Sequence, residues 1–154
     1  MKGGALRLSS FEVLHLLELR KIALTPPLDT AECAEKFTAN DPDFMGYYLV
    51  YKDLRFKGYV VGVSTSHFFR LYERGQKKEN FQATLYVHPL KEGQNIPIKE
   101  LKELLQESQQ SQKSLVIALV DAGGDVSYMK IDSFNISENP TQLRLEYRNP
   151  LGKR

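Results

Sequence analysis

The sequence predicts an α+β protein in which a small, mostly helical N-terminal module precedes a domain built on a mixed central sheet. Up to Gly58 the apolar residues recur with helical spacing, whereas from Tyr59 onward aromatic and β-branched residues form short strand-like runs. The apolar run at 115–120 is typical of a central strand that is buried on both faces. We expect the module to cover residues 1–42 and the larger domain to cover residues 43–154.

The first part of the chain contains signals for three helices. A serine followed by Glu12 predicts a capped helix that starts at residues 9–10 and ends near Arg20. After two consecutive prolines, a second helix is expected over 30–37, and a third over 44–57 that stops at Gly58. One or two short strands are also expected within the N-terminal module.

The larger domain is expected to contain six strands and one further helix. The helix begins at Pro97, with Ile98, Leu101, Leu104 and Leu105 on one face and charged residues on the other. The strands are recognised by alternating or continuous runs of strand-forming residues between turn signals. They are expected at 59–63, 68–72, 83–88, 115–120, 126–131 and 143–147.

Composition excludes several classes of protein. Lys and Arg number 21 against 19 Asp and Glu, and the formal net charge of +2 is too small to indicate a nucleic-acid partner by itself. No apolar run approaches the ~18 residues of a membrane span, and the N-terminus does not resemble a signal peptide. Cys33 has no second cysteine to pair with, and no Cys/His cluster has zinc-ligand spacing. We therefore expect a soluble cytoplasmic protein that needs no metal and no cofactor.

Several long strings after Asp41 follow one another in a characteristic order. They are Tyr48-Leu49-Val50-Tyr51-Lys52-Asp53-Leu54-Arg55, Gly58-Tyr59-Val60-Val61, Phe69-Arg70-Leu71-Tyr72-Glu73-Arg74-Gly75 and residues 115–128. Together these strings resemble the catalytic domain of the archaeal tRNA-splicing endonucleases. The resemblance covers nearly the whole chain, weakly before Asp41 and strongly after it, and the string at 41–44 fits the domain junction of that family.

The resemblance implies metal-independent removal of introns from precursor tRNA. In this reaction a 2′-hydroxyl attacks the neighbouring phosphate, which leaves a cyclic phosphate and a free 5′-hydroxyl. The step needs a base, an acid and a cation at the phosphate, and the family supplies tyrosine, histidine and lysine. Tyr72 and Lys113 fall at the tyrosine and lysine positions, but Gln82 stands at the histidine position. A glutamine amide cannot donate a proton at neutral pH.

Other departures from the family pattern also lie at the expected active site. The loop at 62–66 is shorter than in the catalytic subunits, and neither Gln106 nor Tyr128 is the arginine that the resemblance leads us to expect at these positions. We therefore expect a structural subunit that is inactive alone. One alternative is a catalytic subunit in which Tyr72 and Lys113 are active and Gln82 or His67 compensates for the missing histidine. Another alternative is a general binder of structured RNA.

The resemblance also implies an assembly of two such chains with two catalytic subunits on precursor tRNA, with no membrane contact. An acidic loop holding Asp121 and Asp125 would enter a basic pocket on the opposing pair, although aspartates beside glycines also serve simply as turn formers. Tyr72 and Lys113 likewise have ordinary alternatives, as a strand-end tyrosine and as a cation at a helix end. The final strand would pair subunits through Leu143, Leu145 and Tyr147. Weaker candidates for RNA contact are Arg70, Arg74, Lys77 and Lys78, which could also simply form a solvated face.

Overall fold

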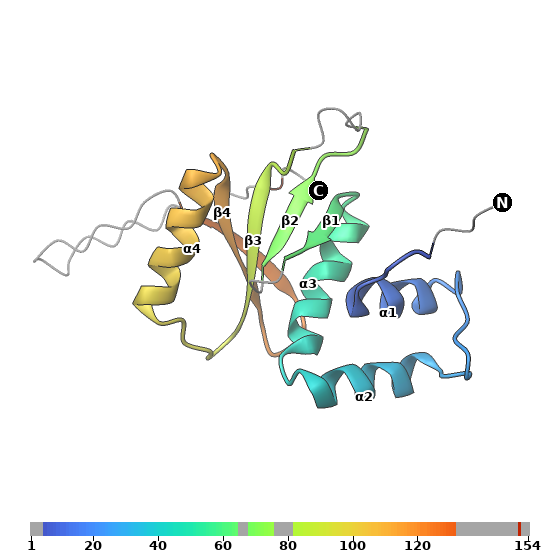
Figure 1. Cartoon of the computed structure of the whole chain (residues 1–154). Coiled ribbons are helices and arrows are strands. Elements are labelled where there is room, and N and C mark those ends of the chain that lie inside the picture. Colours follow the sequence, from blue (N-terminus) through green and yellow to red (C-terminus); the bar gives the residue numbers. More distant parts are fainter. Residues whose placement is uncertain (1–4, 65–67, 76–81, 132–150, 152–154) are drawn as a thin grey trace, which may run out of the picture. The chain divides into compact units, whose positions relative to one another are not determined.

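The computed structural model describes residues 5–64, 68–75, 82–131 and 151 (Figure 1). The chain forms two compact units, Met1–Tyr48 and Leu49–Arg154, which divide within helix α3 (Phe44–Phe56). The domain boundary that the sequence suggests near residue 42 stays a prediction. No helix in the described ranges is long and apolar enough to cross a membrane.

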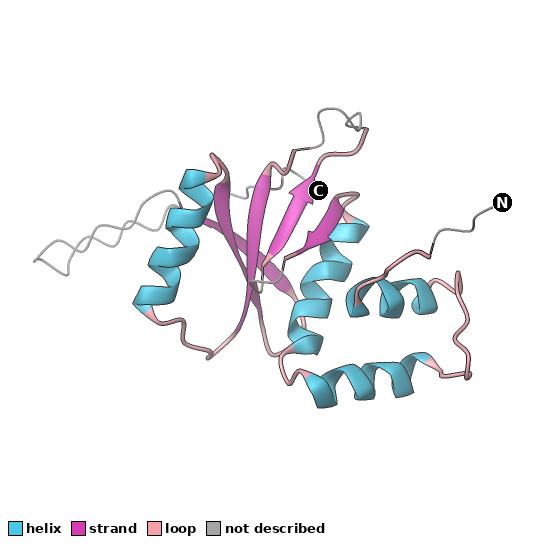
Figure 2. Cartoon of the chain, in the orientation of Figure 1, coloured by secondary structure: helices cyan, strands magenta, loops and turns pink. Residues whose placement is uncertain are grey.

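The N-terminal unit is built from helices whose starts are set by side-chain caps. Helix α1 (Ser10–Glu18) begins at a capping box in which Ser9 and Glu12 bond each other's backbone, which confirms the predicted cap. Helix α2 (Thr30–Asn40) begins at an equivalent box and continues past the predicted end at residue 37. The described residues 5–42 contain no strand, so the short strands predicted there are wrong for these residues (Figure 2).

Three helices end in the same hydrogen-bonded turn. At the end of α4 (Ile98–Gln110), the backbone N–H of Lys113 donates to the carbonyl of Ser108 at 2.7 Å, and that of Gln112 donates to Gln109 at 3.0 Å. This is the Schellman pattern, in which one residue adopts a left-handed conformation. That residue is Gln112 here, with φ 55°, and the equivalent residues after α1 and α3 are Arg20 and Gly58.

Within the described residues, five strands form the predicted mixed sheet in the order β1-β2-β3-β4-β5. Strands β3 and β4 run parallel with α4 between them in the chain, and the other neighbouring pairs are antiparallel. The strand expected at 143–147 lies outside the described residues. The bounds of the strands are β1 Val60–Val63, β2 Phe69–Tyr72, β3 Leu85–Lys91, β4 Ser114–Val120 and β5 Val126–Ile131.

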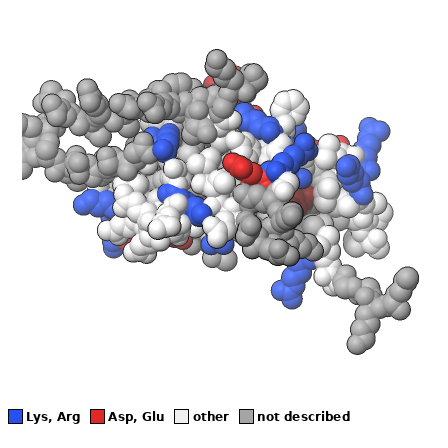
Figure 3. Space-filling view, turned by 90° about the horizontal axis from the view of Figure 1, so that it is seen from above, with Lys and Arg blue, Asp and Glu red and all other residues white. Residues whose placement is uncertain are grey.

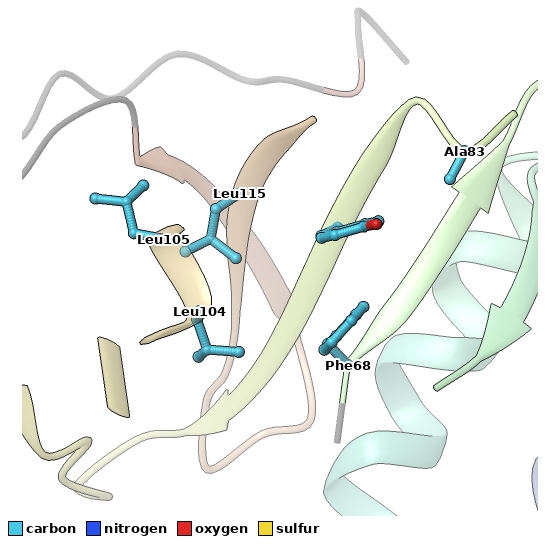
Figure 4. Close-up of a cluster of buried hydrophobic side chains, with 6 residues drawn as sticks. Phe68, Ala83, Leu104, Leu105 and Leu115 are labelled. Atoms are coloured by element: carbon cyan, nitrogen blue, oxygen red, sulfur yellow. The ribbon is translucent and has the colours of Figure 1, made fainter. Parts of the chain in front are cut away.

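Helices cover the two faces of the sheet in the larger unit. Leu104 and Leu105 of α4 point toward Leu115 of β4 and join a buried cluster with Phe68 and Tyr86 on one face (Figure 4). On the other face α3 packs through Tyr51, whose ring centroid lies 6.0 Å from that of Phe69. Strands β3 and β4 therefore have buried residues on both faces, whereas β2 is buried on one face and exposes Arg70 on the other.

Candidate functional site

Tyr72 is the last residue of β2 and lies on the same face of the sheet as Gly62 and Arg70. Gly62 is the direct partner of Arg70 across the β1–β2 ladder. A Cβ atom built on Gly62 would lie 3.1 Å from the Tyr72 ring and 3.8 Å from the Arg70 Cβ. Because Gly62 has no side chain, the half-buried Tyr72 ring lies against β1, while it also packs on the cluster beneath α4.

The ladder between β2 and β3 ends at a bulge just before Tyr72. Leu71 faces Leu85 in the register, yet its carbonyl accepts hydrogen bonds from the Thr84 backbone N–H at 2.7 Å and the Thr84 hydroxyl at 3.2 Å. Leu85, at the start of β3, and Thr84 just before it thus both face Leu71 of β2. Such a bulge locally changes the direction of the side chains. The exposed Gln82 lies just before this bulge.

Lys113 lies at the same end of the sheet as Tyr72 and Gln82. The parallel register begins with Leu85 opposite Ser114, so Lys113 directly precedes the row in which the three strands β2, β3 and β4 are aligned. The turn that ends α4 fixes the Lys113 backbone through its bond to Ser108. The fold therefore brings all three motif positions to one end of three adjacent strands.

Among the described residues at this end of the sheet, none is a histidine. Gln82 offers an amide, which can form hydrogen bonds but cannot act as a general acid. Gln106 is exposed on α4 and carries no charge. His67, the alternative source of an imidazole, lies outside the described residues.

Position 128, where the resemblance leads us to expect an arginine, is a tyrosine that bonds to another part of the fold. Tyr128 of β5 is 5% exposed and donates its hydroxyl hydrogen bond to Asp53 of α3 at 2.5 Å. Asp53 also forms an ion pair with Lys57, whose Nζ lies 5.2 Å from the Tyr128 ring centroid. Burial, followed by the bond to the Asp53 carboxylate, raises the pKa of Tyr128 well above its usual range. This cluster ties β5 to α3.

The β4–β5 turn is held by the side chain of Asp121. One carboxylate oxygen, Oδ1, accepts hydrogen bonds from the backbone of Gly123 at 2.8 Å and of Asp125 at 2.9 Å. Gly124 adopts φ 88° and its backbone donates to the Asp121 carbonyl, as in a hairpin with a glycine bulge. Asp121 therefore forms the turn, whereas Asp125 is exposed beside it.

A third carboxylate, from Glu92, braces this turn and was missed from the sequence. Its Oε2 atom accepts a hydrogen bond from the backbone of Ala122 at 3.1 Å, and its own backbone donates to Val120 at 2.8 Å. The only sequence feature that could have indicated this role is topological: Glu92 directly follows β3, the strand that runs parallel to β4. The turn thus presents three acidic residues, Glu92, Asp121 and Asp125.

Among the described residues, the Lys and Arg side chains visible in Figure 3 occur in separate groups on the face shown. Lys57 is already paired with Asp53, and Arg55 donates to the Tyr59 carbonyl at 3.4 Å. The Arg74 guanidinium lies 3.9 Å from the point where a Cβ of Gly58 would be, and Arg70 is exposed on β2. The remaining candidates for RNA contact or pairing lie outside the described residues: Lys77, Lys78, Leu143, Leu145 and Tyr147.

Comparison with known proteins gives a consistent family. Residues 44–128 match the family described as tRNA intron endonuclease, catalytic C-terminal domain. A tRNA-splicing endonuclease of Methanosarcina barkeri is 32% identical over 133 residues, which are 84% of this chain but only 38% of that protein. The enzyme so named in Thermococcus kodakarensis is 32% identical over 84% of this chain and 78% of its own length, and that of Pyrococcus furiosus is 30% identical over 86% and 78%. The matched residues include β1 to β4 and the first half of β5, and the chain belongs to the tRNA intron endonuclease family.

Proposed function

We propose that this chain is a structural, non-catalytic subunit of a tRNA-splicing endonuclease that removes introns from precursor tRNA at bulge–helix–bulge sites. The observation that carries the proposal is Gln82, an exposed amide at the end of the sheet that also holds Tyr72 and Lys113. Loss of a general acid lowers a rate by ~10²–10⁴-fold. Cleavage in the complex would then depend on a second subunit that retains tyrosine, histidine and lysine.

The acidic turn supports the structural part of this role. Its backbone N–H groups are bonded within the turn or to Glu92, so the loop has its shape before any partner arrives. A preformed anionic loop loses little conformational entropy when it enters a basic pocket. In this assembly two copies of the chain would hold two catalytic subunits at the two intron boundaries, with the final strand at 143–147 as a second contact. We propose that the complex works in the cytoplasm.

A cleavage assay on a bulge–helix–bulge RNA tests this proposal. The chain alone, the catalytic subunit alone and the mixture are incubated with the RNA, and the products are examined for 2′,3′-cyclic phosphate and 5′-hydroxyl ends. We expect cleavage by the mixture and none by this chain alone. Cleavage by this chain alone at a rate comparable to the mixture would contradict the proposal.

The second candidate is a catalytic subunit in its own right. The register that brings Tyr72 and Lys113 to the same end of the sheet favours it. The change Gln82→His separates the two candidates, because a site that lacks only its acid should gain activity after this repair. A general binder of structured RNA is a third possibility, and it would bind without preference for the bulged junction and with a steep salt dependence.

A further inference from the structure

Part of one sheet face, at strands β1 and β2, carries side chains suited to a nucleotide. This is the face that α4 covers, but α4 packs over β4 and lies away from β1 (Figure 1). Arg70 projects from this face and is exposed, Tyr72 follows it two residues later, and Gly62 lies opposite with no side chain. We refer to Gly62, Arg70 and Tyr72 as the β1–β2 shelf.

The Arg70 guanidinium lies near an aromatic ring. Its central carbon lies 5.8 Å from the ring centroid of Phe68, which is 2% exposed and belongs to the buried cluster. Within the described part of the chain no carboxylate pairs with Arg70. Among the described residues, the shelf therefore offers an exposed guanidinium with no carboxylate paired to it, and a guanidinium can bind phosphate in a bidentate manner.

The Tyr72 ring supplies an aromatic surface next to this charge. Gly62 allows the ring to lie against β1, where a built Cβ would be only 3.1 Å from it. The ring is half-buried, so part of it stays accessible. An aromatic ring and a guanidinium on an open sheet face form the combination that stacks a base and holds its phosphate in single-stranded RNA.

We infer that the β1–β2 shelf binds one nucleotide of single-stranded RNA, with the base on Tyr72 and the phosphate on Arg70. The inference rests on the proposed function only in taking RNA as the ligand. It assigns the face an RNA-gripping role that needs neither a histidine nor cleavage. A chain that cannot cut would thus still contribute to holding the substrate.

Fluorescence anisotropy with a labelled mixed-sequence oligoribonucleotide of about ten nucleotides tests the inference on the full chain alone. Salt is varied over roughly 50 to 200 mM. We expect Arg70→Ala to weaken binding and to reduce the slope of log affinity against log salt by about 0.7, the value of one phosphate contact. Tyr72→Leu should weaken binding about tenfold through lost stacking and leave the slope unchanged.

Matched controls separate the shelf from general charge effects. Lys102→Ala removes the same charge from an exposed position on α4 and should change neither affinity nor slope beyond error. A polyglutamate peptide of matched length reports attraction to any polyanion. Backbone amide shifts of Gly62 on addition of RNA to the wild-type chain give a readout that needs no variant, and Arg70→Gln replaces Arg70→Ala if the alanine variant does not fold.

Three outcomes would overturn the inference: no binding of the oligoribonucleotide at about 100 μM, equal effects of Lys102→Ala and Arg70→Ala, or polyglutamate binding as tight as RNA. The structural-subunit proposal would survive each of them, because it is judged by cleavage in the mixture. Failure of cleavage in the mixture, with RNA still bound at the shelf, would reject that proposal and keep this one.

Discussion

The two aspartates of the acidic turn should have different roles: Asp121 should stabilise the turn, and Asp125 should contact a partner subunit. Asp121 accepts two backbone hydrogen bonds through a single oxygen, whereas Asp125 is exposed at the end of the turn. A net contribution of about 0.5–1.5 kcal/mol per bond means that Asp121→Ala should lower the free energy of unfolding by roughly 1–3 kcal/mol. Asp121→Asn keeps an acceptor oxygen and should cost less.

Asp125 should show the opposite behaviour. Asp125→Asn removes a charge that forms no part of the turn's internal bonding through its side chain, so it should leave the free energy of unfolding within about 0.5 kcal/mol of wild type. If Asp125 enters a basic pocket, the loss of its charge in Asp125→Asn should weaken assembly with the catalytic subunit by about 2–5 kcal/mol. The tetramer should then fall apart into smaller species at low concentration.

Two measurements separate these effects. Thermal unfolding of the chain alone should shift by roughly 2–4 °C per kcal/mol for a protein near this size. Analytical ultracentrifugation of the mixture reports the assembly. Glu100→Gln, an exposed acidic position on α4, is the matched control for both. Unchanged thermal unfolding in Asp121→Ala would refute the structural reasoning, and a stable tetramer in Asp125→Asn would remove this residue from the interface.

Three further predictions concern chemistry and stability. Lys113→Ala in this chain should leave cleavage by the mixed complex within a few-fold of wild type in the bulge–helix–bulge assay, and a loss of ~100-fold would show that this site cuts. Gln112→Gly should raise the free energy of unfolding by about 1 kcal/mol because it relieves a left-handed backbone, whereas Gln109→Gly, inside α4, should lower it by a similar amount. Because the folded state raises the pKa of Tyr128, its contribution to stability is complete below the unfolded value of about 10 and decreases as the pH rises above it. Chemical denaturation of Tyr128→Phe should show a weaker loss over that range than wild type.

The fold was largely readable from local patterns, since the decisive signals were close together in the sequence. The cap at Ser9 and the end of α3 at Gly58 each depend on residues within one helical turn. The continuous apolar run of β4 identified the central strand because a strand buried on both faces needs no polar alternation. The predicted strands within 1–42 failed because capped helices and their connections account for the described residues there.

The side-chain partners at the site were not readable, because they join residues far apart in the chain. Glu92 reaches Ala122 only because parallel pairing of β3 and β4 brings the two turns together. Tyr128 bonds Asp53 only because α3 packs against β5. Spacing along the sequence contains neither relationship, so it could not show that Tyr128, at a position where the resemblance leads us to expect an arginine, is part of the internal packing.

Strand β4 separates the end of the sheet that holds Lys113 from the acidic turn. Lys113 directly precedes the strand and Asp121 directly follows it, so at ~3.3 Å per residue the two ends are roughly 25 Å apart. The acidic turn is held by Glu92, by the side chain of Asp121 and by its own backbone, and none of these bonds involves Gln82 or Tyr72. A glutamine in place of a histidine at one end of the strand therefore leaves the bonds of the turn at the other end intact. If the chain is the structural subunit proposed above, this independence of the two ends would let it keep the shape that a partner contacts without cleavage chemistry of its own.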